Sequence, residues 1–243
     1  VYQPQINSVD YTVWGAEALL RYNSPDKGTI PVFDVITILE QSGLIKKVGL
    51  WVLDKALEQC AKWRKVLPNF HISVNISYGQ FEDDDIVDKI LDSVSLHKVS
   101  GTALTLEVTE SMELHTYGKL NKVIEELQYV GIEFSVDDFG TGYSSLSRLK
   151  ELNVDEIKID QCFVSGIQKS VYNYRLLNNM IEWANKCDIR VCCEGVEQKE
   201  ELSVLETLYP QVLQGFLFDK PISSKDFTEI YIDATCDRYK KNI

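Results

Sequence analysis

The stretch YQPQINSVDYTVWGAEALL, residues 2–20, decides how the chain begins to fold. Apolar runs at residues 2–6 and 13–20 predict two strands, and only residues 7–12 separate them. A crossover between parallel strands needs about a dozen residues or more. We therefore expect these two strands to pair antiparallel through a short turn.

Beyond this pair, strand-like runs and helical periodicity alternate along the chain. The further runs lie at residues 70–76, 103–108, 132–136, 156–159, 189–193 and 211–216. Apolar residues recur three or four positions apart, as in helices, at residues 50–63, 86–94, 120–130, 174–186 and 200–208. This alternation, in a chain of 243 residues, has the size of a (β/α)8 barrel. We predict an α/β fold, a modified TIM-like (β/α)8 barrel with one antiparallel strand.

The chain shows no internal repeat, no linker rich in proline, glycine or serine, and no long block of charge. It is therefore interpreted as a single domain over residues 1–243, with residues 235–243 as a frayed tail. It begins with Val1 rather than Met and is strand-like from its second residue. These features indicate a fragment of a longer protein.

The composition excludes several classes of function. Hydrophobic residues make up 44% and charged residues 26%, which is typical of a globular protein, and the net charge is −12. That charge disfavours a DNA or RNA polymer, or an anionic membrane, as a partner. No apolar run reaches the roughly 18 residues of a membrane span. The six cysteines have no C-x-x-C spacing, which favours reduced thiols and a cytoplasmic domain, although the full-length protein could be membrane-anchored.

Acidic and polar residues recur where the strand-like runs end. They are Glu17, Asn75, Glu107, Asp137, Asp138, Lys158, Asp160 and Glu194. In a parallel barrel these ends share one face, the face on which (β/α)8 enzymes place their chemistry. Converging carboxylates repel one another unless a cation compensates them. Oxygen ligands suit Mg²⁺, Mn²⁺ or Ca²⁺ rather than structural Zn²⁺, and two such ions bridged by an aspartate can activate water for phosphoryl transfer.

Each of these residues also has a simpler interpretation. A single acidic residue at a strand end is usually a helix N-cap or a solvated loop residue. Residues 137–143 fit either a turn into a helix or a mobile catalytic loop. Lys158 is more informative, because a lysine directed into a barrel is costly unless a carboxylate or a phosphate meets its ammonium group.

In this order and spacing, the motifs resemble the EAL domain family of cyclic di-GMP phosphodiesterases. The resemblance runs from residues 2–4 to residues 220–221. Its signature is EALLRY at residues 17–22, and further matches lie at residues 75–77, 107–110, 137–146, 158–160, 194–197 and 214–216.

The resemblance implies a role for each matching residue. The first metal ion would be held by Glu17, Asn75, Glu107 and Asp137, with Asp137 bridging to a second ion near Asp138. Lys158 would hold the attacking water or a phosphate oxygen, and Glu194 would act as general base or as ligand of a metal-bound water. Glu110 would anchor the loop after Asp138. The residues implied in substrate binding are Leu20, Arg21, Glu197, Gln214 and Pro221.

The implied activity is hydrolysis of cyclic di-GMP to linear 5′-pGpG by in-line attack of a metal-activated water. Two Mg²⁺ or Mn²⁺ ions would serve as cofactors, whereas Ca²⁺ would bind and inhibit, because its looser coordination positions water poorly. One alternative is a catalytically silent cyclic di-GMP receptor, and another is a barrel hydrolase for a different phosphodiester. Attached sensor or cyclase domains and a homodimer are further expectations, although no residue pattern marks an interface.

Overall fold

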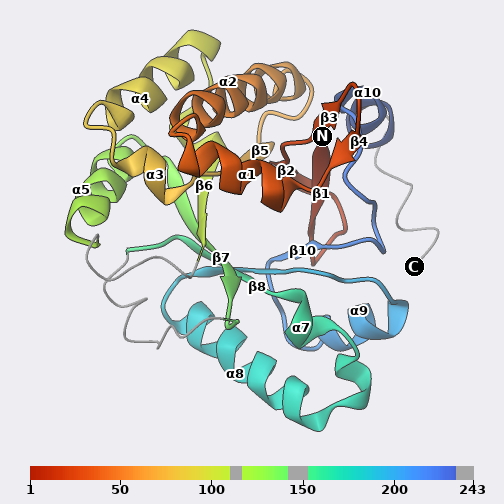
Figure 1. Ribbon diagram of the computed structural model, residues 1–243. Helices are drawn as coiled ribbons and strands as arrows, with labels where there is room; N and C mark the ends of the chain where they lie inside the picture. Colours follow the sequence, from red (N-terminus) through yellow and green to blue (C-terminus); the bar gives the residue numbers. More distant parts are fainter. Residues whose placement is uncertain (110–116, 142–152, 234–243) are drawn as a thin grey trace.

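The computed structural model describes residues 1–109, 117–141 and 153–233, and its centre is a closed barrel (Figure 1). Around the barrel the strands follow the order β1, β10, β9, β8, β7, β6, β5 and β2. Their bounds are β1 Tyr2–Asn7, β2 Val13–Ala18, β5 His71–Asn75, β6 Leu104–Thr109, β7 Glu133–Phe139, β8 Glu156–Ile159, β9 Arg190–Cys193 and β10 Val212–Gln214. Each predicted strand is present, and the predicted barrel is confirmed.

Strand β1 runs opposite to the others. It pairs antiparallel with β2, where Gln3 faces Glu17, and with β10, where Gln5 faces Gln214. The other neighbouring strands of the barrel are parallel. The short connection enforces this reversal, because the Asn7 amide donates to the Thr12 carbonyl at 2.9 Å and closes the turn.

Helices surround the barrel, at the five predicted places and at others (Figure 1). The α-helices are α1 Val32–Gln41, α2 Ile45–Trp63, α3 Tyr78–Phe81, α4 Ile86–His97, α5 Tyr117–Gln128, α7 Gln161–Val164, α8 Val171–Lys186, α9 Lys199–Leu205 and α10 Ser224–Phe227. Short turns of other helix types are η1 Gly101–Ala103, η3 Ile167–Lys169 and η4 Thr228–Ile232. Among the described residues, no helix combines the length and the hydropathy needed to cross a bilayer.

Two features differ from the sequence-based expectation. A small hairpin, β3 Tyr22–Ser24 and β4 Gly28–Ile30, follows β2, and α1 comes after it with no buried residue. Strands of three residues are too short for a period of two to be recognised in the sequence. The predicted frayed tail, residues 235–243, lies outside the described residues, as does Glu110.

The barrel interior is polar, while the hydrophobic core lies between the barrel and the helices. In β6, for example, Leu104 and Leu106 pack outward into the core, whereas Thr105 and Glu107 belong to the inner set. Buried polar side chains of the strands are Gln3, Gln5, Glu17, Ser73, Thr105, Glu107, Ser135, Glu156, Lys158 and Gln214. Most inner groups of such an interior need a partner across the barrel, so an inner atom without one marks a place where a ligand can bind.

The amino-terminal end of the barrel is closed by an aromatic stack over an ion-pair network. A bulge leaves Trp14 unpaired between Val13 and Gly15. Its ring stacks on His71 with centroids 4.5 Å apart, and the Arg190 guanidinium lies 5.4 Å from the Trp14 ring centre. Gly15 is required here, because a Cβ atom would lie 2.5 Å from the His71 carbonyl oxygen.

The Arg190 network generates a stability prediction. Arg190 pairs with Glu156 and Glu133, each at 2.6 Å, and Glu156 is only 3% exposed. Arg190→Met should lower the free energy of unfolding by about 3–5 kcal/mol, because it leaves a buried carboxylate uncompensated. Urea unfolding measures this change. Lys186→Ala, which removes an exposed pair with Glu182, is the matched control and should cost at most about 1 kcal/mol. Equal losses in the two variants would contradict the prediction.

Candidate active site

The candidate site is built around the ammonium group of Lys158, which is fully buried at the carboxyl end of β8. Four carboxylates surround Nζ: Glu107 at 2.8 Å, Glu194 at 2.8 Å, Asp137 at 3.2 Å and Glu17 at 3.3 Å. They come from β6, the residue after β9, β7 and β2, so strands on all sides of the barrel contribute. Of the two partners considered for this lysine from the sequence, a carboxylate or a phosphate, the structure places carboxylates beside it.

Two amide side chains orient Glu17. Asn75, at the end of β5, donates to Oε1 of Glu17 at 2.7 Å, and Gln214, at the end of β10, donates to Oε2 at 2.7 Å. Burial by itself raises the pKa of Glu17. The charge of Lys158 and the amide hydrogen bonds outweigh burial and hold this pKa below its usual value. Glu17 therefore remains an anion that can bind a cation.

The other carboxylates carry more negative charge than Lys158 can balance. Burial, and next the charge of Glu17, raise the pKa of Glu107 well above its usual range. Burial raises the pKa of Glu194 to about 8, although Lys158 opposes this shift. At Asp138 burial and the neighbouring Asp137 raise the pKa. Without a further cation, the site therefore compensates its charge by holding protons.

The donor set fits divalent cations. Carboxylate oxygens lie within 4.8 Å of one another in two groups, Glu17 with Glu107 and Asp137, and Asp137 with Asp138 and Glu194. Asp137 belongs to both groups. Oε1 of Glu107 is buried and has no hydrogen-bond partner among the described residues. An unpaired buried carboxylate oxygen, in a site whose charged donors are carboxylates, matches Mg²⁺, Mn²⁺ or Ca²⁺ rather than a softer metal.

Asp138 begins a tight turn at the rim of this site. Its φ is 54°, a left-handed value that is uncommon outside glycine, and its amide donates to Oδ1 of Asp137 at 3.0 Å. Thr141 closes the turn by donating from Oγ1 to the Asp138 carbonyl at 2.9 Å. Gly140 is needed because a Cβ atom there would lie 2.6 Å from the Phe163 ring. The chain from residue 142 to residue 152, including the rest of the expected loop, lies outside the described ranges.

The residues expected to bind substrate have different surroundings. Gln214 is buried inside the barrel, whereas Arg21 is exposed and its guanidinium donates to the Leu20 carbonyl at 2.7 Å. Glu197 is exposed in the loop after β9. Pro221 precedes Ile222, which bridges to Tyr2 at the start of β1. Arg21, Leu20 and Pro221 thus lie near the same barrel end as the carboxylates.

Sequence reasoning missed Gln3 of β1. It accepts a hydrogen bond from Gln214 at 3.2 Å, so it orients the amide that holds Glu17. The available signal was the alternation of Gln3 and Gln5 with Pro4 and Ile6, which places both glutamines on one face of a strand.

Comparison with known proteins assigns the family. The family model described as the EAL domain matches residues 1–221. The chain belongs to the EAL domain family. The signature of that family is the EALLRY segment, which begins in the last two residues of β2 and continues beyond the strand.

Relatives of this EAL domain include proteins of cyclic di-GMP metabolism. Cyclic di-GMP phosphodiesterase PdeR of Escherichia coli is 36% identical over 95% of the chain and 35% of PdeR. The solved structure of the MucR phosphodiesterase in complex with cyclic di-GMP has a TM-score of 0.86 and 32% identity, and the match covers 93% of this chain and 92% of that one. The full MucR of Pseudomonas aeruginosa is 33% identical over 92% of the chain and 33% of MucR. The chain therefore spans about a third of the length of these curated relatives.

A further structural relative bears on the metals. BlrP1 of Klebsiella pneumoniae has been solved as calcium and manganese complexes with cyclic di-GMP. The manganese complex has a TM-score of 0.81 and is 27% identical, covering 92% of this chain and 55% of that one. The acidic groups described above are of a kind that divalent metals bind.

The raised pKa of Glu194 predicts how the metal-free protein responds to pH. Its folded pKa of about 8 lies above the usual 4.5, so the folded state binds more protons than the unfolded state between these values. Stability in EDTA should fall as the pH rises from about 5 to 8, with a contribution of at most about 1.4 kcal/mol per pH unit. Urea unfolding across this range measures the slope. Glu194→Gln should flatten it, whereas the exposed Glu125→Gln should leave it unchanged, and an equal slope in all three proteins would refute the prediction.

Proposed function

We propose that this EAL domain hydrolyses one phosphodiester bond of cyclic di-GMP and releases linear 5′-pGpG. The observation that carries the proposal is the buried Lys158 with its four carboxylates, at the barrel end where (β/α)8 enzymes place catalysis. The printed functions of PdeR and of the MucR phosphodiesterase support this substrate.

The site residues form two groups, and we assign one cation to each group. Glu17, Asn75, Glu107 and Asp137 would hold one ion, and Asp137, Asp138 and Glu194 would hold the second. When bound, two Mg²⁺ or Mn²⁺ ions would lower the pKa of water and offset the charge of the phosphodiester. Asn75 now donates its amide to Glu17, so its amide would have to turn to present the carbonyl oxygen.

Lys158 and Glu194 have different proposed tasks. The Lys158 ammonium, held by carboxylates on several sides, would donate a hydrogen bond to the attacking water or to a phosphate oxygen. Of its four partners, the Glu194 side chain is the most exposed, at 18%. Glu194 is therefore the carboxylate best placed to take a proton from an entering water. Glu110 remains a proposed anchor of the loop after Asp138.

Substrate would approach the rim of the same barrel end. An exposed Arg21 whose guanidinium contacts only a backbone carbonyl among the described residues can turn toward a phosphate. Leu20, Gln214, Glu197 and Pro221 complete the proposed substrate contacts. Because the chain has a net charge of −12, bound cations and Arg21 would be needed to make the site attractive to an anion.

The main alternative is a receptor that binds cyclic di-GMP without cleaving it. Loss of a charged member of the cluster would favour that alternative, and the described part of the cluster retains Glu17, Glu107, Asp137, Asp138, Lys158 and Glu194. The third possibility, a different phosphodiester as substrate, is open to a screen of other cyclic dinucleotides.

We also propose that this domain is part of a longer protein. Residues 1–243 would form one EAL domain of a longer signalling protein with sensor or cyclase domains, since the chain spans about a third of its curated relatives. The printed description of MucR as both cyclase and phosphodiesterase supports such an arrangement. A cytoplasmic location and a homodimer complete this proposal.

The activity is tested by incubating the purified domain with cyclic di-GMP in Mg²⁺, Mn²⁺, Ca²⁺ or EDTA and separating the products by chromatography. Linear pGpG should appear with Mg²⁺ and Mn²⁺, and little or none with Ca²⁺ or EDTA. Intact cyclic di-GMP that nevertheless binds under every condition would support the receptor alternative. Absence of binding would reject this substrate.

A single substitution tests the shared ligand. Asp137→Asn should lower the rate of pGpG formation at least about 100-fold, because Asp137 belongs to both carboxylate groups. Asp26→Asn, which changes an exposed aspartate in the β3–β4 turn, is the matched control and should retain full activity. Comparable activity of Asp137→Asn and Asp26→Asn would show that the metal assignment is wrong.

A further inference from the structure

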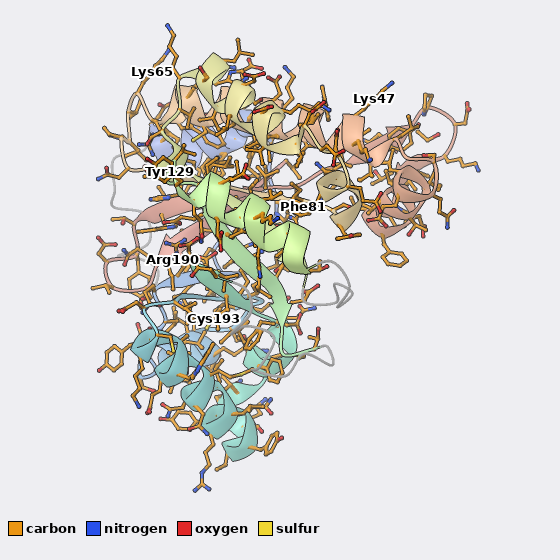
Figure 2. All side chains as sticks on the ribbon, turned by 90° about the vertical axis from the view of Figure 1, so that its left-hand side faces the viewer. Lys47, Lys65, Phe81, Tyr129, Arg190 and Cys193 are labelled. Atoms are coloured by element: carbon orange, nitrogen blue, oxygen red, sulfur yellow. The ribbon has the colours of Figure 1, made fainter. Side chains whose placement is uncertain are left out.

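A cavity lies at the opposite end of the barrel from the acidic site. Its volume is about 890 Å³, and its lining includes Val13, Trp14, His71 and Glu133, the first residues of β2, β5 and β7 or their neighbours. In Figure 2, Arg190, Tyr129 and Lys65 lie toward this end, and Phe81 and Lys47 lie toward the other. His71 and Asn75 stand four positions apart on β5, roughly 13 Å along the strand. The cavity is therefore separate from the acidic site.

The lining residues that come from strands or their neighbours, called the floor below, include two aromatic rings. Trp14 and His71 are stacked with an interplanar angle of 5°, and Glu133 is tied to Arg190 at 2.6 Å. Nδ1 of His71 is buried and has no hydrogen-bond partner in the described part of the chain. Burial lowers the pKa of His71 to about 4, so this ring is neutral at pH 7. The floor thus contains two stacked rings that carry no charge at pH 7.

The walls of the cavity combine apolar side chains with one cation. Leu67, Phe70, Ile230 and Ile232 contribute apolar surface, and Arg64 lies among them. One Arg64 nitrogen, Nη1, donates to the Phe70 carbonyl at 2.6 Å, and within the described ranges no ion pair involves this guanidinium. Its remaining donors are therefore available to an anion. Glu133 is held by Arg190, a guanidinium that it shares with Glu156.

We propose that this cavity binds a small aromatic anion, a fused-ring carboxylate or sulfonate, independently of the acidic site. The volume lies in the range of small-molecule sites, which are mostly apolar with a few placed polar groups. Aromatic rings of the ligand pack against the apolar walls and floor, and its acidic group pairs with Arg64, whose planar guanidinium suits carboxylate geometry. Nothing in this proposal depends on hydrolysis of cyclic di-GMP.

The probe is 8-anilinonaphthalene-1-sulfonate, an aromatic sulfonate that fluoresces in apolar surroundings. Titration of the full chain in EDTA should show saturable binding with one site per chain, and 2-naphthoate should displace the probe. Arg64→Gln should weaken the affinity roughly 10-fold or more, because a charge-assisted contact is lost. Asn69→Trp, which places an indole at the exposed rim of the cavity, should abolish saturable binding.

The control variant changes an exposed aromatic residue outside the cavity. Phe33→Ala removes an aromatic side chain that is 79% exposed on α1 and does not line the cavity, so its probe affinity should equal that of the parent. Thermal unfolding establishes whether each variant is folded. If Arg64→Gln does not fold, the probe affinity of Asn69→Trp decides the test. Unchanged affinity in a folded Arg64→Gln or Asn69→Trp protein, or absence of a saturable site in the parent, would overturn the proposal. Because the readout uses no cyclic di-GMP, its failure is distinguishable from failure of the proposed phosphodiesterase activity.

Discussion

One buried ammonium group among four carboxylates is the constraint on which the structure depends. Lys158 can remain charged in the barrel only because strands from every side bring a carboxylate within 3.3 Å of its nitrogen. This arrangement needs a closed barrel, correct register and partners for the surrounding amides. The reversed β1 contributes to the last requirement, because it places Gln3 beside Gln214, which in turn holds Glu17.

The same strands carry a second ionic network at the other end of the barrel. On β8, Glu156 belongs to the Arg190 network and Lys158 to the acidic site. Small polar residues such as Ser73 and Ser135 lie between the two levels. The Arg190 network sets one guanidinium against two carboxylates and is capped by Trp14, which suits a structural role. The acidic site sets one ammonium group against four carboxylates, a larger excess of negative charge that only additional cations or protons can offset. This division agrees with the general separation of stability and chemistry between the two ends of (β/α)8 barrels.

The sequence predicts most of the barrel because the outward-facing residues of its strands are apolar and buried against the helices. These residues appear in the sequence as short apolar runs. The sequence also predicts that acidic residues converge, since strand ends share one face, although Asp160 instead caps α7 and belongs to neither carboxylate group. It could not predict the β3–β4 hairpin, whose strands are three residues long, or the bulge that turns Trp14 toward His71. The Arg190 pairs join residues that are distant in the sequence, and their register follows only from the closed barrel. Glu110 and the loop after Thr141 stay sequence-based expectations.

Three glutamates around one lysine show how hydrogen bonding and exposure differentiate identical side chains. Glu17 receives two amide hydrogen bonds and keeps a lowered pKa, while Glu107 is equally buried, accepts no amide and has a raised pKa. Glu194 stands nearer the opening and titrates at about 8. A cation entering the cluster therefore meets one carboxylate that is already anionic and two that must release protons. Metal binding would therefore be coupled to proton release in this site, and Glu107, whose Oε1 is buried without a hydrogen-bond partner among the described residues, would take part in that coupling.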